Sequence, residues 1–509
     1  MKKKILSSML VAAMAASMIV GCGSDAPAAP ATPATPSNGG DTTTPAAPAA
    51  DATTITVYRC SYNVAAPDEA QVKKVETAIN EYLASKGATV QIDLHDIGSG
   101  EYGQKANLAF NNGEVDLLWH ASWWGDGIGT NDIYANNGAY DLTDLIAGSL
   151  LESSMDSAVW EGSKYDGKIY FVPVYKEAYE GYDLKIPVEK INKYGWDVST
   201  IKELKDIEPM LADLKADGIE YPYAANTTAM FYRYYIDKFD FFTQNALFGV
   251  DRETNEVVDP ILSDEYAEFC KLMGSWYQQG YISDGDLTKS WNETYYQDPA
   301  KWGISWWTCV PGGEDVNSST RDKQEEVIID GITGKYMHST TTLGSCYCVS
   351  SSSTEAEAAA AVEFLGLLNT DNTLADLYTF GIEGEDYTIE NGFVAPNPEK
   401  YGHSAWESTS VKALSLTVGE PEDKVADYIA KNGAAVASCA AGFRFNKAPV
   451  EAKYTACVAI MEEDGYQLEL GAIAPDKVDA FIADYQAKLD AAGYQDVLAE
   501  FQAQYDAWK

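Results

Sequence analysis

The chain has 509 residues, of which 46% are hydrophobic and 12% aromatic, and it carries a formal net charge of −41. This apolar content indicates buried cores, and the length suits two or three domains. The negative charge argues against nucleic acid and anionic membrane surfaces as partners, and it disfavours a strongly anionic ligand.

The N-terminus predicts export and a lipid anchor. A basic stretch, Lys2–Lys4, precedes an apolar run over residues 5–20 that is too short for a comfortable transmembrane helix. The run leads into Ile19-Val20-Gly21-Cys22, which resembles a bacterial lipobox. The resemblance implies that residues 1–21 are removed as a signal peptide and that Cys22 is lipidated. The alternative is an ordinary signal peptide followed by a chance cysteine.

A tether follows the lipidated cysteine, and the two together span residues 22–53. Beyond Cys22 this segment consists almost entirely of Ala, Pro, Thr, Ser, Gly and Asp. Such a segment cannot bury a core, and its prolines favour extended conformations. At about 3 Å per extended residue, it reaches on the order of 90 Å from the membrane.

Alternating strand and helix patterns begin at residue 54. Apolar positions at helical spacing predict helices at 68–85 and 101–112, and a glycine lies just beyond each. Strands are predicted at 54–60, 89–94 and 115–119. This β-α-β-α-β order predicts a parallel sheet with helices on its faces.

The same alternation returns later in the chain. Thr354-x-x-Glu357 resembles a capping box and predicts the start of a helix that runs to about residue 368. The fold class expected is therefore α/β. The other elements predicted are a strand at 342–349 and helices at 206–217, 264–278, 475–491 and about 498–508.

No cofactor and no metal are expected. Gly98-x-Gly100-x-x-Gly103 matches a dinucleotide-binding pattern, but Glu101 sits where a pyrophosphate would lie, and such cofactors are not expected outside the cell. Cys346 and Cys348 share one face of a strand, yet a zinc site needs two more ligands and no histidine pair has suitable spacing. The cysteines after Cys22 are odd in number and lie mostly in apolar stretches. Buried thiols are therefore predicted, and the formation of one disulfide stays an open alternative.

Aromatic clusters carry the functional signal. Trp119-His-Ala-Ser-Trp123-Trp124-Gly125 lies just beyond the end of a predicted strand, where open α/β sheets bind ligands. Adjacent Trp123 and Trp124 point in different directions, and exposed tryptophans in a glycine-rich loop suit a sugar, whose C–H face stacks on aromatic rings. Trp302-Gly-Ile-Ser-Trp306-Trp307 repeats the pattern at another strand end. For both pairs the alternative is packing in a core.

Several segments, by their order along the chain, carry a resemblance to a known family. The segments are GEVDLLWHASW (113–123), YDGKIYFVPVYKE (165–177), WYQQGYI (276–282), GIEGEDY (381–387), GFRF (442–445) and the tail that begins LDAAGYQDVL (489–498). Together they resemble family 1 extracellular solute-binding proteins, the substrate-capturing lipoproteins of carbohydrate ABC importers, and are most similar to the LplA-like branch. The resemblance covers nearly all of residues 54–509.

The resemblance implies a two-lobed fold of the periplasmic-binding-protein type. Each lobe would be a mostly parallel sheet flanked by helices, and the ligand would lie in a cleft between the lobes, which close on it like a hinged clamp. The first lobe would hold residues 54–177 and 337–381. The second would hold residues 178–336 and 382–509, including the C-terminal helices.

The resemblance also implies a set of ligand-binding residues. Glu177, Asn63 and His120 would orient sugar hydroxyls while the aromatic rings stack. The alternative for Glu177 is a salt bridge at the hinge. Trp306 and Trp307 are added because of their position at a strand end. The resemblance itself implies His120, Ser122, Trp123 and Trp124 from the binding loop, Tyr175 and Glu177 from the crossover, and Tyr62 and Asn63 from the loop after the first strand.

The function expected is ligand binding rather than catalysis. A monomer, anchored at the extracytoplasmic face of the cell membrane, would capture a carbohydrate, expected to be an oligosaccharide, and deliver it to ABC permease subunits. Three alternatives stay open: a binder of peptides or other polar solutes, a sensor lipoprotein, and a surface carbohydrate-active enzyme. The enzyme would require a catalytic carboxylate pair in the cleft.

Overall fold

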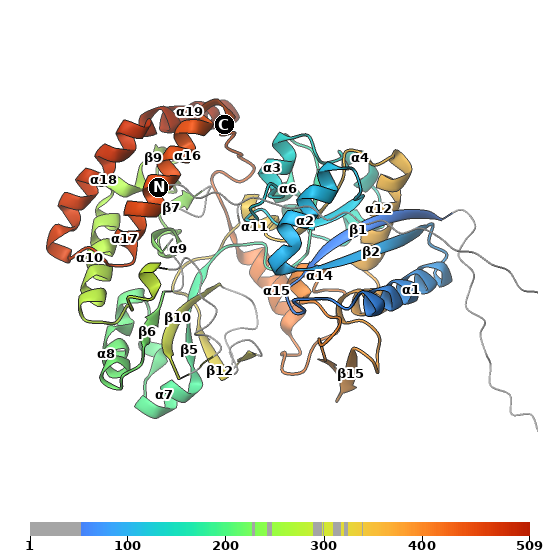
Figure 1. The fold of residues 1–509 in the computed structure, drawn as a ribbon, viewed down its shortest axis with the longest axis horizontal. Helices are drawn as coiled ribbons and strands as arrows, with labels where there is room; N and C mark the ends of the chain where they lie inside the picture. The colour runs from blue at the N-terminus through green and yellow to red at the C-terminus, as the bar shows by residue number, and fades with distance from the viewer. Residues whose placement is uncertain are drawn as a thin grey trace, which may run out of the picture. The chain divides into compact units, whose positions relative to one another are not determined.

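The computed structural model describes residues 52–225, 230–241, 247–288, 298, 300–308, 317–319, 324–337 and 339–509. The predicted signal peptide, the lipidation site Cys22 and the tether up to residue 51 lie outside the described residues. The described part contains two five-stranded sheets, each covered by helices (Figure 1).

The first sheet has the strand order β2-β1-β3-β14-β4. Strand β1 pairs in parallel with both β2 and β3, which confirms the parallel β-α-β-α-β start of the fold. Strand β14 pairs antiparallel with β3 and β4, and it joins the sheet after a long excursion of the chain. The bounds are β1 (Thr53–Ser61), β2 (Val90–Gly98), β3 (Leu117–His120), β4 (Phe171–Pro173) and β14 (Cys346–Val349).

Helices pack against this sheet as the sequence pattern predicts. Helix α1 (Glu69–Ser85) packs against β2, and α12 (Glu355–Leu368) packs against β1 (Figure 1). Asp68 caps α1 by accepting hydrogen bonds from the amides of Ala70 and Gln71. The capping box at the start of α12 is confirmed, because the Thr354 amide donates to Glu357 at 2.7 Å.

Helix α2 (Ser99–Asn111) begins directly at the end of β2, and close backbone approaches explain two glycines of the G-x-G-x-x-G match. A Cβ on Gly98 would stand 1.9 Å from the carbonyl oxygen of Ala65. A Cβ on Gly103 would stand 2.1 Å from a carboxylate oxygen of Asp126. Backbone packing therefore requires glycine at position 98, and a Cβ at position 103 would displace the side chains of Asp126 and Trp124.

The second sheet has the strand order β11-β12-β5-β10-β6. Only β10 and β6 pair in parallel, and the other neighbours are antiparallel. We expected mostly parallel pairing in each sheet. This expectation fits the β2-β1-β3 part of the first sheet better than it fits the second sheet. The bounds are β5 (Tyr182–Pro187), β6 (Tyr221–Ala224), β10 (Trp302–Thr308), β11 (Asn317–Ser319) and β12 (Gln324–Ile329).

Helices from the C-terminal part of the chain pack beside the second sheet. Helix α10 (Asp264–Gln278), predicted with these bounds, packs against α18 (Val478–Ala492). Helices α16 (Glu451–Ile460) and α19 (Tyr494–Trp508) complete this group; α16, α18 and α19 are drawn in orange to red in Figure 1. Among the described residues, no helix is both long and apolar enough to cross a membrane.

The remaining helices and strands are short. The helices are α3 (Thr130–Ala135), α4 (Thr143–Ile146), α5 (Leu150–Ser153), α6 (Ser157–Ser163), α7 (Val188–Tyr194), α8 (Glu208–Ala216), α9 (Phe231–Tyr234), α11 (Ser339–Thr342), α13 (Asn372–Phe380), α14 (Ala405–Ser408), α15 (Lys424–Ala434) and α17 (Tyr466–Glu469). The strands are β7 (Phe239–Phe241), β8 (Gly249–Asp251), β9 (Val257–Val258), β13 (Tyr336–Met337), β15 (Tyr387–Glu390), β16 (Phe393–Pro396) and β17 (Val436–Ala437).

One predicted strand differs in the structure. The strand expected at 342–349 starts only at Cys346, because residues 339–342 form α11. The hydroxyls of Thr341 and Thr342 donate to the carbonyls of Ala178 and Gly162, which holds this turn of helix in place.

The described residues form two large hydrophobic cores. The first core draws on residues 55–178 and on residues 337–428, including Tyr401, Val411 and Tyr428. The second draws on residues 182–329 and 440–505. Each sheet therefore has its own core. The chain passes from the first core to the second near residue 180, returns near residue 337, and passes to the second core again between residues 428 and 440.

Candidate ligand-binding site

Five aromatic rings gather beyond the ends of strands in the first sheet. Tyr62 follows β1, Trp119 lies in β3, Trp123 and Trp124 follow β3, and Trp406 lies in α14. We call Tyr62, Trp119, Trp123, Trp124 and Trp406 the aromatic platform. Neighbouring ring centroids within it are 5.0 to 6.4 Å apart.

The exposed part of the platform is built on a buried base. Trp119 is fully buried, and its indole N–H donates to the Ser345 hydroxyl at 2.9 Å. Trp123 remains 44% exposed and Tyr62 remains 39% exposed. Large apolar rings of this exposure in a loop are characteristic of binding surfaces rather than of cores.

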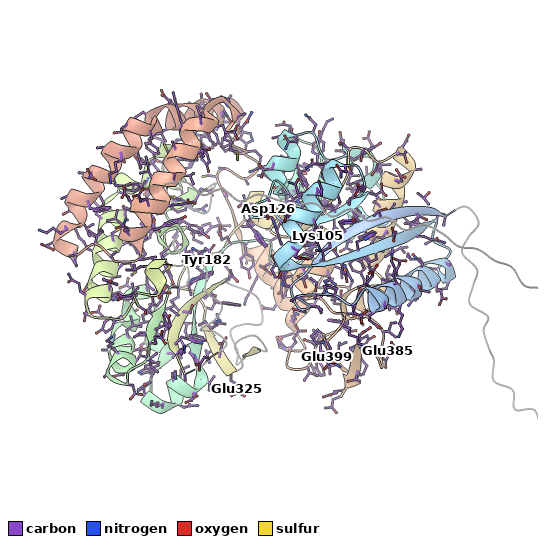
Figure 2. All side chains as sticks on the ribbon, in the orientation of Figure 1. Lys105, Asp126, Tyr182, Glu325, Glu385 and Glu399 are labelled. Carbon is purple, nitrogen blue, oxygen red and sulfur yellow. The ribbon has the colours of Figure 1, made fainter. Side chains whose placement is uncertain are left out.

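Trp123 is held in a fixed orientation although it is exposed. Its indole N–H donates to the Gly344 carbonyl at 2.7 Å, and its ring stacks on Trp124 with a centroid distance of 5.4 Å and an interplanar angle of 27°. Asp126, which lies over α2 (Figure 2), and Trp124 both approach Gly103, where a Cβ would stand 2.8 Å from the Trp124 indole nitrogen. The loop is therefore preorganised against α2.

Trp406 is the platform residue that sequence reasoning missed. Its ring lies 5.0 Å from Tyr62 and 6.4 Å from Trp123, measured between centroids. Helix α14 has only four residues, and more than 300 positions separate Tyr62 from Trp406 in the chain. Ser404-x-x-Glu407 is a capping pattern that signals the helix, but nothing local signals that its tryptophan joins the platform.

Two residues predicted from the resemblance are turned into the first core. His120 is fully buried against Phe171 and Cys346, and burial lowers the pKa of its imidazole to about 3. Tyr175 is 1% exposed and donates to Asp156 at 2.7 Å. We do not include either residue in the proposed site, because neither ring reaches solvent in this structure.

Ser122 and Glu177 lie beside the platform with partners of their own. The Ser122 hydroxyl donates to the Thr340 carbonyl at 2.6 Å, which ties the Trp123 loop to the segment before β14. Glu177 forms an ion pair with Lys176, and both side chains are about seven-eighths buried. The ammonium of Lys176 also lies 3.7 Å from where a Cβ on Gly344 would stand, so this pair sits close to the carbonyl that holds Trp123.

Asn63 lies at a cavity next to the platform. Its carbonyl oxygen accepts a hydrogen bond from the Ser404 hydroxyl at 3.1 Å, and its side chain is exposed. The cavity has a volume of about 220 Å³. Its polar lining includes Asn63, Ser404, Thr417, Glu420 and Lys424, and apolar side chains such as Phe380 and Leu414 complete it.

Trp306 and Trp307 lie in the second sheet and form a different group. Trp306 is 8% exposed, its indole N–H donates to the Ala225 carbonyl at 2.7 Å, and the Arg233 guanidinium lies 4.2 Å above its ring. Trp307 is partly buried, and Lys185 lies 4.0 Å from its ring centroid. Tyr182, labelled in Figure 2, packs edge-on against Trp306.

The cysteines of the described part are free thiols. Cys60, Cys270, Cys346, Cys348 and Cys457 are buried, and Cys439 is partly buried. Cys309 lies outside the described residues. Within the described part, no group of three or more His, Cys, Asp or Glu side chains is arranged to hold a metal ion.

Comparison with known proteins agrees with this architecture. Residues 439–509 match the family model of a domain of unknown function, DUF3502. A carbohydrate ABC transporter substrate-binding protein of Streptococcus pneumoniae serotype 4 is 26% identical over 449 residues, which covers 84% of this chain and 88% of that protein.

Solved structures resemble the chain over nearly its whole folded length. The N-glycan transport solute-binding protein NgtS of Streptococcus pneumoniae has a TM-score of 0.75 at 24% identity, covering 89% of this chain and 98% of its own. An HMO-binding solute-binding protein of Bifidobacterium longum infantis has a TM-score of 0.58 at 14% identity, covering 90% and 99%. The fold is therefore the α/β fold of the solute-binding proteins of ABC transporters.

Proposed function

We propose that this protein is the substrate-binding lipoprotein of an ABC importer and that it captures an oligosaccharide. The observation that carries the proposal is the aromatic platform, whose exposed rings Tyr62 and Trp123 stand beyond the strand ends of an α/β sheet. The relatives support it, because one is named a carbohydrate substrate-binding protein and NgtS has been solved with Man5GlcNAc.

The physical match is between flat rings and sugar faces. A pyranose presents C–H groups on its faces and hydroxyls around its rim, so it stacks on indole and phenol rings while polar groups meet the rim. Trp123 is already fixed by its bond to Gly344, so little rotational freedom is lost when a sugar stacks on it. This preorganisation favours binding to the platform.

Polar groups for the sugar rim are available in the cavity beside the platform. Asn63 and Ser404 present an amide and a hydroxyl, which donate to and accept from sugar hydroxyls. We propose that a sugar residue stacked on the platform continues into this cavity, so that a ligand of more than one residue is bound. The amide of Asn63 and the hydroxyl of Ser404 are neutral, and the charged pair in the lining, Glu420 with Lys424, is balanced, which suits an uncharged glycan on a chain with a net charge of −41.

We propose two lobes that close around the ligand, with Trp306 and Trp307 on the second. The division follows residues 54–177 with 337–381 and residues 178–336 with 382–509 as expected, with one change. We assign the segment from residue 382 to about 434 to the first lobe, because Tyr401, Val411 and Tyr428 pack in the first core. Glu177 then lies at the crossover, where its ion pair with Lys176 suits a hinge.

We further propose that Cys22 is lipidated and that the protein works as a monomer at the extracytoplasmic face of the membrane. The lipobox-like sequence and the Pro-rich tether support this placement. The LplA-like branch of family 1 stays our assignment from the sequence motifs. In this role the protein binds and releases its ligand unchanged, and the closed form presents both lobes to the permease.

A thermal-shift experiment on residues 54–509 tests the proposal. Mannose- and N-acetylglucosamine-containing oligosaccharides, other sugars and short peptides are compared, and a bound ligand raises the melting temperature by mass action. We expect a glycan to stabilise the protein and to be recovered intact by mass spectrometry. Stabilisation by peptides alone would overturn the sugar assignment, and cleavage of the glycan would show an enzyme instead.

A further inference from the structure

Within the described residues, the chain crosses between the two hydrophobic cores three times, and the crossing segments lie side by side. Glu180 and Tyr336 exchange backbone hydrogen bonds of 2.8 Å and 2.9 Å, and β13 pairs in parallel with β17. Any movement of one core relative to the other must bend these segments. We call them the hinge; they are residues 178–181, 335–337 and 432–438.

Asn432 fixes the end of the hinge at the first core. It lies in the last turn of α15 and is 6% exposed. Its side-chain oxygen accepts from the Ala178 amide at 2.8 Å, and its side-chain nitrogen donates to the Lys176 carbonyl at 2.8 Å. The Thr341 hydroxyl donates to the Ala178 carbonyl at 2.9 Å. Both backbone groups of Ala178 are thus held at the first core, so bending starts after this residue.

Asp240 fixes the end of the hinge at the second core. A carboxylate oxygen of the fully buried Asp240 accepts from the Ser438 hydroxyl, and the Arg252 guanidinium lies 3.5 Å from the same oxygen. Arg252 also lies 3.9 Å from the ring centroid of Tyr336. Ser438 follows β17 directly, so the third crossing has only residues 433–437 between its two anchors.

Helix α15, drawn in orange in Figure 1, connects the cavity beside the platform to this hinge. Lys424, its first residue, lines the cavity, and Tyr428 packs in the first core. Asn432 lies a further four residues along, and this spacing places all three side chains on one face of the helix. Strand β17 begins two residues after α15 ends. A movement of α15 therefore reaches the hinge through Asn432 and through β17.

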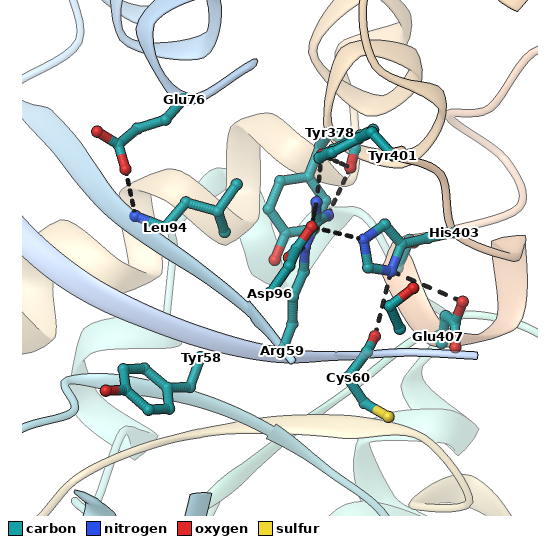
Figure 3. Close-up of polar contacts among 12 residues, drawn as sticks. Tyr58, Arg59, Cys60, Glu76, Leu94, Asp96, Tyr378, Tyr401, His403 and Glu407 are labelled. Atoms are coloured by element: carbon teal, nitrogen blue, oxygen red, sulfur yellow. Dashed lines mark hydrogen bonds and ion pairs between the residues drawn. The ribbon is translucent and has the colours of Figure 1, made fainter. Parts of the chain in front are cut away.

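The cavity has one wall that is held firmly and one that is held by a single ion pair. His403 lines the cavity, and its Nε2 lies 3.0 Å from Asp96, which is paired with the fully buried Arg59 (Figure 3). At α15 the lining is the ion pair of Lys424 with Glu420, whose side chains keep 13% and 28% exposure. The end of the cavity at α15 is therefore the part that a ligand can shift.

We propose that Asn432 is a positioning residue through which α15 transmits occupancy of the cavity to the hinge. A sugar that contacts Lys424 and Glu420 steadies the first turn of α15, and Asn432 carries this change to Ala178, about 12 Å along the helix. Coupling between two sites is reciprocal, so the hinge in turn sets the affinity of the cavity. The part of the ligand rests on the proposed function, whereas the coupling of Lys424 to Asn432 does not.

A double-mutant cycle in the ligand-free protein tests the coupling. Lys424→Met breaks the ion pair at the cavity, and Asn432→Leu keeps the side-chain size and removes both hydrogen bonds to the crossover. Hydrogen exchange is followed by mass spectrometry in peptides that contain residues 176–181. We expect about tenfold faster exchange in Asn432→Leu, a smaller increase in Lys424→Met, and no further increase in the double variant. Increases that multiply in the double variant, or no increase in Lys424→Met, would overturn the proposal.

Asn80→Leu and Lys105→Met are the matched controls. Asn80 makes the same pair of bonds, because it accepts from the Ile92 amide at 2.9 Å and donates to the Ile92 carbonyl at 2.8 Å. Lys105 pairs with the glutamate four residues before it, as Lys424 does. Neither control should change exchange at residues 176–181. An equal change in the controls would show a general loss of stability and would contradict the proposal.

Two further measurements keep the test decisive. If circular dichroism shows that Asn432→Leu does not fold, Asn432→Ser replaces it, and the increases must again fail to multiply. With Man5GlcNAc as the probe, exchange at residues 176–181 should slow about fivefold or more in the wild type and stay unchanged in the Asn432 variant. Binding without slowing in the wild type, or slowing that persists in the variant, would refute the role of Asn432. Absence of any glycan binding would defeat the proposed function, and the double-mutant cycle would still decide the coupling.

Discussion

Two tryptophan pairs, similar in sequence, have different environments in the two sheets. Trp123 and Trp124 follow the end of β3, where the chain is free to turn, and Trp123 stays 44% exposed. Trp306 and Trp307 lie within β10, where successive side chains point to opposite faces, and Trp306 enters the second core with 8% exposure. The position relative to the strand end decides whether such a pair forms a surface or a core.

The same comparison applies to the hydrogen bonds of the indole groups. Both exposed Trp123 and buried Trp306 donate to backbone carbonyls, at 2.7 Å in each case. In Trp306 this bond satisfies a buried donor, which a core requires. In Trp123 it fixes a ring that solvent could otherwise leave mobile, which a binding surface requires.

Replacing the buried Trp306 should have the largest effect of the changes that test this comparison between the two pairs. Trp306→Ala should lower the free energy of unfolding by about 3–5 kcal/mol, because it leaves a cavity in the second core and removes the ring under Arg233. Urea unfolding followed by circular dichroism measures the change. A loss of less than about 1 kcal/mol would show that Trp306 is not part of the core.

Buried carboxyls make the second core sensitive to pH. Glu469 accepts from the Met230 and Phe231 amides, and burial raises its pKa from 4.5 to about 7. The folded state thus holds a proton that the unfolded state releases, so stability is full below about pH 4.5 and is lost as the pH rises through 7. The loss is on the order of 3 kcal/mol.

Glu469→Gln sharpens this comparison between the cores. Urea unfolding at several pH values from 5 to 9 measures the free energy of unfolding. This free energy should fall less with rising pH in the variant than in the wild type, mainly below pH 7.5. Burial also raises the pKa of Glu407 in the first core to about 8, and any loss of stability from that carboxyl should be the same in both proteins. Equal slopes in both proteins would mean that Glu469 does not hold a proton in the folded state.

Local patterns were sufficient to predict most of the first sheet. The helical spacing of Val72, Val75, Ile79 and Leu83 and the glycines after the helices specify α1 and α2, and both form as expected. The antiparallel pairing in the second sheet was not predictable in this way. Strand β5 pairs with β10 and β12, which lie more than 100 residues further along the chain, and no local pattern encodes that partnership.

In the candidate binding site, too, local sequence patterns reveal only part of the arrangement. Trp123 was found because aromatic residues follow a predicted strand, which is a local signal, whereas Tyr62 came from the family resemblance. His120 and Trp123 are three residues apart, yet one is buried and the other exposed, because His120 is the last residue of β3 and faces Phe171. Trp406 reaches the platform only through tertiary packing, so its role could be found only from the structure.

Removing the exposed tryptophan should separate binding from stability. Trp123→Ala should change the unfolding free energy by no more than about 1 kcal/mol and weaken glycan binding at least tenfold, because the stacking ring is lost. Isothermal titration calorimetry measures the affinity. Trp508→Ala, which removes an indole of similar exposure from α19, is the matched control and should bind normally. Equal affinities in the two variants would exclude Trp123 from the site.

Asn63 gives the smallest expected effect and tests the extension into the cavity. Its amide should form one hydrogen bond to a sugar beyond the platform, worth about 0.5–1.5 kcal/mol, so Asn63→Ala should weaken binding of a longer glycan about two- to tenfold. A monosaccharide that only stacks on the rings should bind equally well to both proteins. Asn112→Ala, an exposed asparagine at the end of α2, controls for the loss of a surface amide. If Asn63→Ala weakens the short and the long ligand equally, Asn63 contacts the stacked sugar itself, and the cavity does not extend the site.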